Sequence, residues 1–121
     1  MALYEISFAK IILLESDLAE VIVNEGVDID LKMVEEIHHA LLSIFSSHFS
    51  LLINKKNSYS TQLDALMTFG QLAVIEKIAV FAPNKMAKLS ADFSATIPSS
   101  SALNIEVFTH RDDALAWLKI T

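Results

Sequence analysis

A repeated sequence pattern in the second half of the chain constrains the fold most strongly. After residue 45, three short runs of β-branched and aromatic residues each lead through a polar break into an amphipathic stretch with helical spacing. Such βα units place their strands in parallel and cover the sheet with the intervening helices. The sequence therefore predicts an α/β domain built around one sheet.

The three units can be placed along the chain. Their predicted strands are Phe49–Asn54, Lys77–Ala82 and Asn104–Phe108. Their predicted helices run from a capping signature at Thr61 to about Leu72, over the apolar positions Met86, Leu89 and Phe93, and onward from a cap at Thr109. The loop-like segment Ile97–Ala102 is too short to divide domains, so we expect one domain over residues 1–121.

The first half of the chain predicts an antiparallel start followed by one long helix. The expected strands are Tyr4–Ala9, Lys10–Glu15 and Leu18–Asn24, and the short break at Ser16-Asp17 favours a hairpin. Asp30 can cap a helix from about Leu31 to Ser47, whose apolar residues recur at helical spacing. The expected fold is one mixed sheet, with an N-terminal antiparallel hairpin, βα units and about four helices.

Composition and charge exclude several classes of function. An apolar content of 53% in 121 residues can fill a core without metal or disulfides, and the chain has no cysteine, so we expect a cytoplasmic protein. Apolar runs such as Ile11–Leu14 are far too short for membrane insertion. Residues 1–36 carry nine acids and two lysines, a net charge of −7. Such a charge repels the phosphates of nucleic acid, so nucleic acid is not an expected partner. The alternative explanation of these acids is that they only keep an apolar domain in solution.

Motifs for catalysis, metal or cofactor binding do not reach the required spacing. Two glycines, Gly26 and Gly70, cannot build a phosphate-binding or dinucleotide-binding loop. His38 and His39 are adjacent and point about 100° apart on a helix, so they do not form a metal pair. His38 lies on the apolar stripe and is predicted to be a core or boundary histidine. We therefore expect a protein that is not an enzyme, with no cofactor and no metal.

The closing segment Val107–Leu118 reads VFTHRDDALAWL and resembles the tail of SpoIIAA-like proteins, relatives of the STAS (sulfate transporter and anti-sigma-factor antagonist) fold. The resemblance implies a bacterial regulatory module that acts through protein contacts. In its phosphorylatable members, a serine follows a buried strand in an Asp-Ser-Ser-Gly context. Residues 54–61 here lack that aspartate and glycine. Three hydroxyl residues stay candidates for a phosphosite or a helix cap: Ser58, Ser60 and Thr61.

Basic residues follow the predicted parallel strands, where the carboxyl ends of such strands form ligand sites. They are Lys55, Lys56, Lys85, His110 and Arg111. Together they form a predicted cationic rim that can receive an acidic peptide, a phosphorylated partner or a small anion, although ordinary loop solvation is the alternative. The high apolar content leaves two further possibilities open, a homodimer face and a pocket for a lipid-like ligand.

Overall fold

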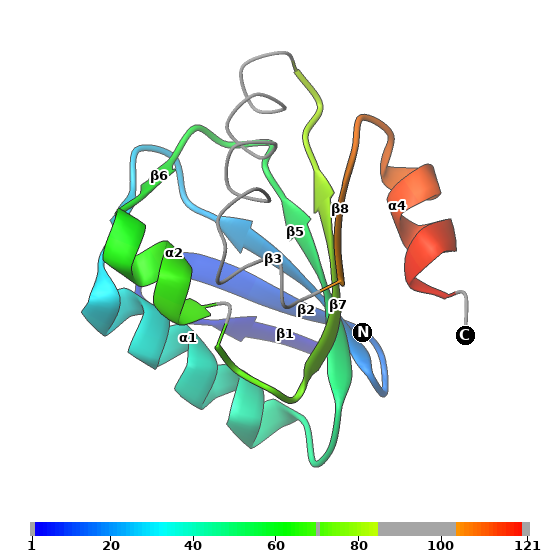
Figure 1. Cartoon of the computed structure of the whole chain (residues 1–121), viewed down its shortest axis with the longest axis horizontal. Helices are drawn as coiled ribbons and strands as arrows, with labels where there is room; N and C mark the ends of the chain where they lie inside the picture. Colours follow the sequence, from blue (N-terminus) through cyan, green and yellow to red (C-terminus); the bar gives the residue numbers. More distant parts are fainter. Residues whose placement is uncertain (1, 70, 85–103, 120–121) are drawn as a thin grey trace.

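The chain folds around one six-stranded sheet that carries helices on both of its faces. The computed structural model describes residues 2–69, 71–84 and 104–119. Its elements in chain order are β1 (Ala2–Glu5), β2 (Ala9–Glu15), β3 (Leu18–Val23), β4 (Asp28–Ile29), α1 (Leu31–Ile44), β5 (Phe49–Asn54), β6 (Ser60–Thr61), α2 (Leu63–Phe69), β7 (Ile75–Phe81), β8 (Asn104–Phe108) and α4 (Arg111–Leu118). Figure 1 shows their arrangement.

The sheet is mixed, as the sequence predicts. Its strand order is β1-β2-β3-β5-β7-β8. The first three strands are antiparallel neighbours, whereas β3, β5, β7 and β8 run in parallel. The short strands β4 and β6 form a separate two-stranded parallel ribbon. The α/β class with an antiparallel start is therefore confirmed.

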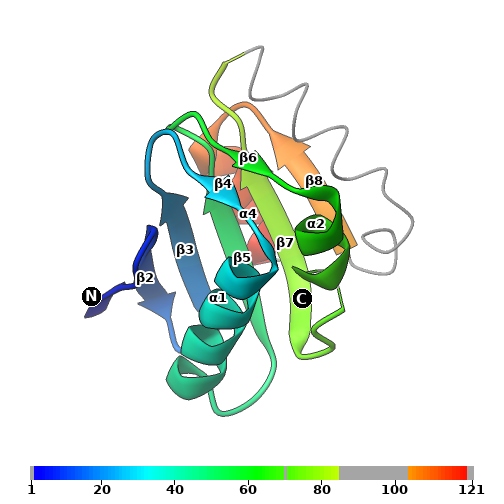
Figure 2. The same cartoon turned by 90° about the vertical axis from the view of Figure 1, so that its left-hand side faces the viewer.

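The hydrophobic core has two parts, one on each face of the sheet. Helices α1 and α2 lie on one side of the sheet and α4 lies on the other (Figure 1, Figure 2). Alternate strand residues such as Ile11, Val21 and Leu51 face α1 and form the larger cluster with Leu41. The smaller cluster lies under α4 and contains Leu18, Leu52, Ala79, Ala114 and Leu118.

The first predicted strand is wrong in its extent. The turn lies at Ser7-Phe8, where the Ile6 amide donates to the Ala9 carbonyl at 3.0 Å, so β1 ends at Glu5 and β2 starts at Ala9. Ser7 leaves the sheet because its amide and hydroxyl both donate to the Glu36 carboxylate on α1, at 2.8 and 2.7 Å. A contact between segments distant in sequence thus sets this turn.

Helix α1 has the predicted cap and ends earlier than predicted. The Met33 amide donates to Asp30 Oδ1 at 3.0 Å, which confirms Asp30 as the N-cap. The helix ends at Ile44 rather than Ser47, because Phe45 adopts an extended backbone (φ −105°, ψ 137°). Its ring then stacks on Phe49 at 4.4 Å between centroids.

The other helix starts also need correction. Helix α2 begins at Leu63, so Thr61 lies in β6 and does not cap it; the Gln62 carbonyl accepts the first helical hydrogen bond, from the Leu66 amide. His110 rather than Thr109 occupies the N-cap of α4, without a side-chain capping bond. Three helices lie in the described residues against about four predicted, and the helix predicted over 86–93 falls outside them. No helix in the described ranges is long and apolar enough to cross a membrane.

Candidate functional site

The carboxyl ends of the parallel strands meet at one edge of the sheet, as predicted. The Lys55 amide donates to the Phe81 carbonyl at 2.9 Å, and the Ala82 amide donates to the Phe108 carbonyl at 2.8 Å. These two bonds place the turns after β5, β7 and β8 side by side, at the top of Figure 1. Lys85, the rim residue predicted after β7, lies outside the described residues.

The β4–β6 ribbon extends the same edge beyond the sheet. Gly26 turns the chain with a positive φ of 79°, and its amide donates to the Ser58 carbonyl at 2.7 Å. The Ser60 hydroxyl donates to Asp28 Oδ1 at 2.8 Å, and Gln62 Nε2 donates to Asp28 Oδ2 at 3.0 Å. The loops after β3 and β5 are therefore joined to each other.

Two of the three candidate hydroxyl residues, Ser58 and Ser60, thus lie beside carboxylates, whereas Thr61 pairs with Ile29 in the ribbon. Ser58 and Ser60 are exposed, and the Ser58 amide donates to Glu25 Oε2 at 2.9 Å. Hydrogen bonds from Gln62 and then Ser60 hold the pKa of Asp28 below its usual value, so Asp28 is charged at neutral pH. A phosphate on Ser60 would meet this charge, which makes the site unlike an anion-binding helix start.

Arg111, one of the predicted rim cations, forms a partly buried ion pair with Glu20 that was not predicted from the sequence. Its guanidinium donates to Glu20 with Nη2–Oε1 at 2.5 Å and Nε–Oε2 at 3.3 Å, and Asn54 Nδ2 donates to Glu20 Oε2 at 2.8 Å. Burial raises the pKa of Glu20, but the bonds from Arg111 and Asn54 and the charges of Arg111 and Lys56 outweigh it, so the pKa lies below its usual value. The signal was available: Glu20 interrupts the otherwise apolar strand Leu18–Val23.

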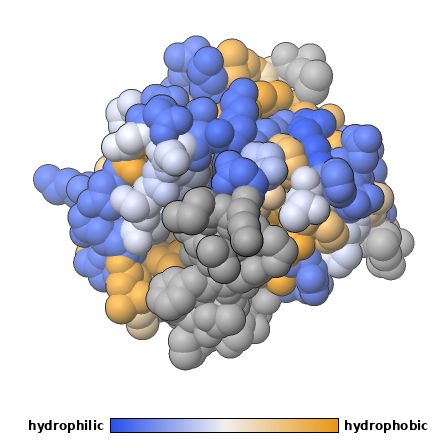
Figure 3. All heavy atoms as spheres, turned by 90° about the horizontal axis from the view of Figure 1, so that it is seen from above, coloured by the Kyte–Doolittle hydropathy of each residue, from blue (hydrophilic) through white to orange (hydrophobic). Residues whose placement is uncertain are grey.

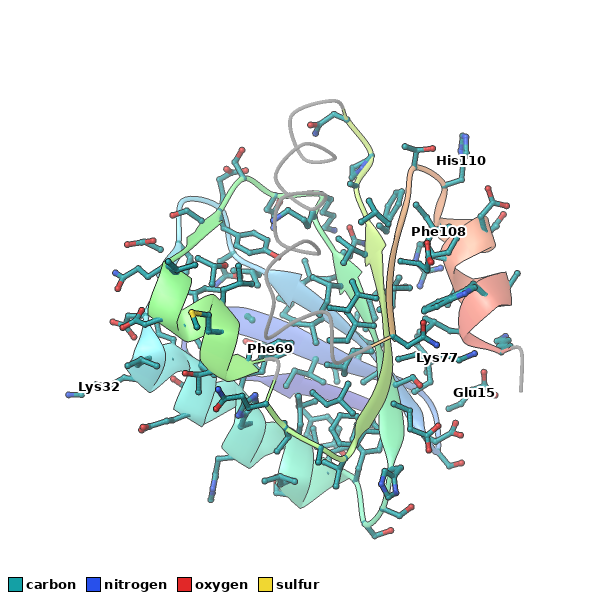
Figure 4. The ribbon with its side chains drawn as sticks, in the orientation of Figure 1. Glu15, Lys32, Phe69, Lys77, Phe108 and His110 are labelled. Atoms are coloured by element: carbon teal, nitrogen blue, oxygen red, sulfur yellow. The ribbon has the colours of Figure 1, made fainter. Side chains whose placement is uncertain are left out.

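The remaining rim cations differ in how far they can meet a ligand. Lys55 is partly buried with its Nζ 3.8 Å from the centre of the Tyr59 ring, and burial lowers its pKa. Lys56 and His110 are exposed. Figure 4 shows His110 at the start of α4, on the same edge as the other turns. The four described rim residues therefore share an edge, but Arg111 and Lys55 already have partners within the chain.

Exposed apolar side chains gather where α1 and α2 begin. Because Ile29 pairs with Thr61 in the ribbon, Leu31 and Leu63 start their helices side by side. Leu31 is 40% exposed, Leu63 58% and Met67, one turn along α2, 41%. We call Leu31, Leu63 and Met67 the helix-end patch. Seen from above, apolar surface appears at lower left in Figure 3, on the side of these helices.

His38 packs α1 against α2. Its ring stacks on Phe69 with centroids 5.2 Å apart, and its buried Nε2 has no hydrogen-bond partner within the described part of the chain. Burial lowers the pKa of His38, although a backbone hydrogen bond with Phe69 partly opposes it. These contacts agree with the predicted boundary histidine. In the segments that the structure describes, no three acidic or histidine side chains come together as a metal site.

Comparison with known proteins identifies the fold. No family model and no curated protein matches the sequence. Among solved structures, a DUF3478-family protein with a SpoIIAA-like fold from Shewanella loihica PV-4 superposes with a TM-score of 0.58. The alignment has 12% sequence identity and covers 97% of this chain and 90% of that one. The chain therefore has a SpoIIAA-like fold, which confirms the fold expected from its closing segment.

Proposed function

We propose that this protein is a small non-enzymatic binding module that acts through contact with a protein partner, in a regulatory role like that of an anti-sigma-factor antagonist. The SpoIIAA-like fold supports a regulatory module of this kind. The observation that carries the proposal is the helix-end patch. Three large apolar side chains on the adjacent helices α1 and α2, at or near the starts of these helices, are each at least 40% exposed.

Charge around the helix-end patch indicates the chemistry of the partner. Glu35 and Asp64 are exposed on α1 and α2, and Asp28 is exposed on the adjoining strand β4, whereas Lys32 is the one lysine or arginine that the described residues place on these elements. Protein interfaces commonly place apolar anchors at the centre and complementary charges at the rim. The expected partner therefore presents an apolar segment flanked by lysine or arginine residues.

The predicted cationic rim is the competing surface for a partner. Its exposed members in the described residues, Lys56 and His110, belong to the same edge but lie on other turns. A partner bound through them would be acidic or phosphorylated instead of basic. The two surfaces can therefore be separated by substitution.

The test identifies a partner first and then maps its binding surface. Proteins captured from the native host are identified by mass spectrometry, and the best candidate is purified and titrated by calorimetry. We expect the double variant L63D/M67D to abolish binding, because it replaces exposed anchors with charges. The matched variant K56E/H110E should bind as the unchanged protein does, and thermal melts check that both variants fold. If only K56E/H110E lost binding, the partner would bind at the cationic rim and not at the helix-end patch.

A lipid-like ligand, the alternative function, gains less support. The region between α1 and the sheet is filled by large side chains, including the stacked rings of Phe45 and Phe49 and the fully buried Leu41 and Leu51. Such packing favours a solid core over a ligand pocket. Native mass spectrometry of the purified protein should accordingly show the mass of the chain without an added lipid.

A further inference from the structure

Strand β1 ends the sheet and leaves one row of backbone groups without a strand beside it. It pairs with β2 on one side, and no strand of the described residues lies on its other side. Hydrogen-bonded pairs alternate along an antiparallel ladder. Because Ile6 donates to Ala9 in the same register, the bonded pairs are Tyr4–Ile11 and Ala2–Leu13. The amides and carbonyls of Leu3 and Glu5 therefore point outward.

The next ladder gives an independent check on this alternation. The Asn24 amide donates to the Phe8 carbonyl at 2.9 Å, in register with Lys10–Ile22 and Ile12–Glu20. Lys10 and Ile12 consequently direct their backbone groups toward β3, which leaves Tyr4 and not Leu3 bonded to β2. Both ladders therefore indicate that the backbone amides and carbonyls of Leu3 and Glu5 point away from β2.

We propose that β1 pairs antiparallel with β1 of a second copy of this chain, with Tyr4 opposite Tyr4 of the second copy. A two-fold axis perpendicular to the sheet requires that opposing residues face the same side, and this register satisfies it. Leu3 of each copy then lies opposite Glu5 of the other, and their outward groups form four hydrogen bonds. The inference concerns a surface separate from the helix-end patch and does not depend on the proposed function.

The side chains and charges of β1 suit this pairing. Leu3 is 54% exposed and Tyr4 40%, so pairing removes apolar surface from water on both faces of the sheet. Lys10 lies directly opposite Glu5 within each copy, which compensates the only charge on β1. Strand β1 also contains no proline or lysine, the residues that commonly block edge pairing. Because four-residue strands bury little area, the dimer should be weak and concentration-dependent.

Cysteine cross-linking tests the register, because the chain has no cysteine of its own. In the proposed dimer the Tyr4 Cα atoms lie about 4.5 Å apart, within disulfide range. The Leu3 Cα atoms lie more than about 8 Å apart and out of range. Under mild oxidation, Y4C should form a covalent dimer many-fold faster than L3C. Faster cross-linking of L3C, or equal slow cross-linking of both, would overturn the proposal.

A second variant tests the backbone bonds without altering the fold. Leu3→Pro removes an outward amide and none of the bonds between β1 and β2. Sedimentation from micromolar to millimolar protein should show a growing dimer for the unchanged chain and monomer for L3P, with equal thermal midpoints. The L63D/M67D variant should dimerise normally. A monomer throughout for the unchanged chain, or an undiminished dimer for L3P, would contradict the inference.

Discussion

Glu20 and Arg111 illustrate how one residue pair can connect an end helix to the central sheet. Glu20 is 4% exposed in β3, and its partner is the first residue of α4. Replacing Arg111 with Met leaves this carboxylate buried, with Asn54 as its one remaining hydrogen-bond donor among the described side chains. We expect a loss of about 2 kcal/mol in the free energy of unfolding at neutral pH, less than for a fully buried pair because the Arg111 side chain is 39% exposed. Urea denaturation measures it.

At acidic pH, the free energies of unfolding of the unchanged chain and of the R111M variant should differ less than at neutral pH. In the unchanged chain the pKa of Glu20 is lower folded than unfolded, so its contribution is present above pH 4.5 and is lost as pH falls through the folded pKa. Without the hydrogen bond and charge of Arg111, the folded pKa of Glu20 is lowered less, so the variant loses less stability as pH falls. The double variant E20M/R111M is the control and should recover most of the stability. A difference that widens in acid would contradict the assignment.

His38 predicts a different pH dependence. Its pKa is lowered from 6.5 by burial, so the unfolded chain binds the proton first as pH falls below about 6.5. The contribution of the neutral His38 ring to the free energy of unfolding is therefore fully present above that pH. It declines as the pH falls from about 6.5 toward the pKa of His38 in the folded chain. His38→Phe should flatten this part of the stability profile and keep the stack on Phe69. His39→Gln, at the exposed neighbouring position, should retain the slope, and an unchanged slope in H38F would refute the prediction.

At the scale of elements, the β4–β6 ribbon determines how a charge on Ser60 would act. The side chains of Ser60 and Gln62 both donate hydrogen bonds to the charged Asp28 carboxylate. Replacing Ser60 leaves Asp28 Oδ1 without the bond from the Ser60 hydroxyl. Ser60→Asp should melt at a lower temperature than Ser60→Ala, because it adds a like charge beside Asp28. Added salt should reduce the difference between the two variants by screening. Equal midpoints at low salt would show that the ribbon tolerates a phosphate.

Patterns within one element were predictable, whereas boundaries set by distant contacts were not. Asp30 caps α1 and Phe49–Asn54 forms a buried strand, because capping and apolar runs are local properties. The turn at Ser7 depends on Glu36, which is 29 residues away. Likewise Thr61 resembles a helix cap in sequence, but pairing with Ile29 draws it into a strand.

At the scale of the whole molecule, the strand topology made it predictable that the turns after the parallel strands share one edge. Which side chains at that edge remain free to bind a ligand was not predictable, because Arg111 pairs with Glu20. Parallel strands brought the turns at Lys55 and His110 to one edge, as the strand order implied. That Arg111 would turn inward to Glu20, 91 residues away, required the tertiary structure. The helix-end patch was missed for a related reason. Leu63 has the helical spacing of a core residue, and only the packing of α2 against α1 leaves it exposed.

The two cores of unequal size imply that the molecule opens in parts. Helix α4 packs on the sheet through Ala114 and Leu118, whereas α1 buries Val34, Ile37 and Leu41, the last two within the larger cluster. Leu118→Ala should therefore raise hydrogen exchange throughout α4 and leave the amides of α1 and β5 protected. Leu41→Ala, at a side chain with no exposed surface, should lower global stability by about 2–5 kcal/mol and raise exchange everywhere. Equal exchange in α1 and α4 of the L118A variant would show instead that both faces of the sheet unfold as one unit.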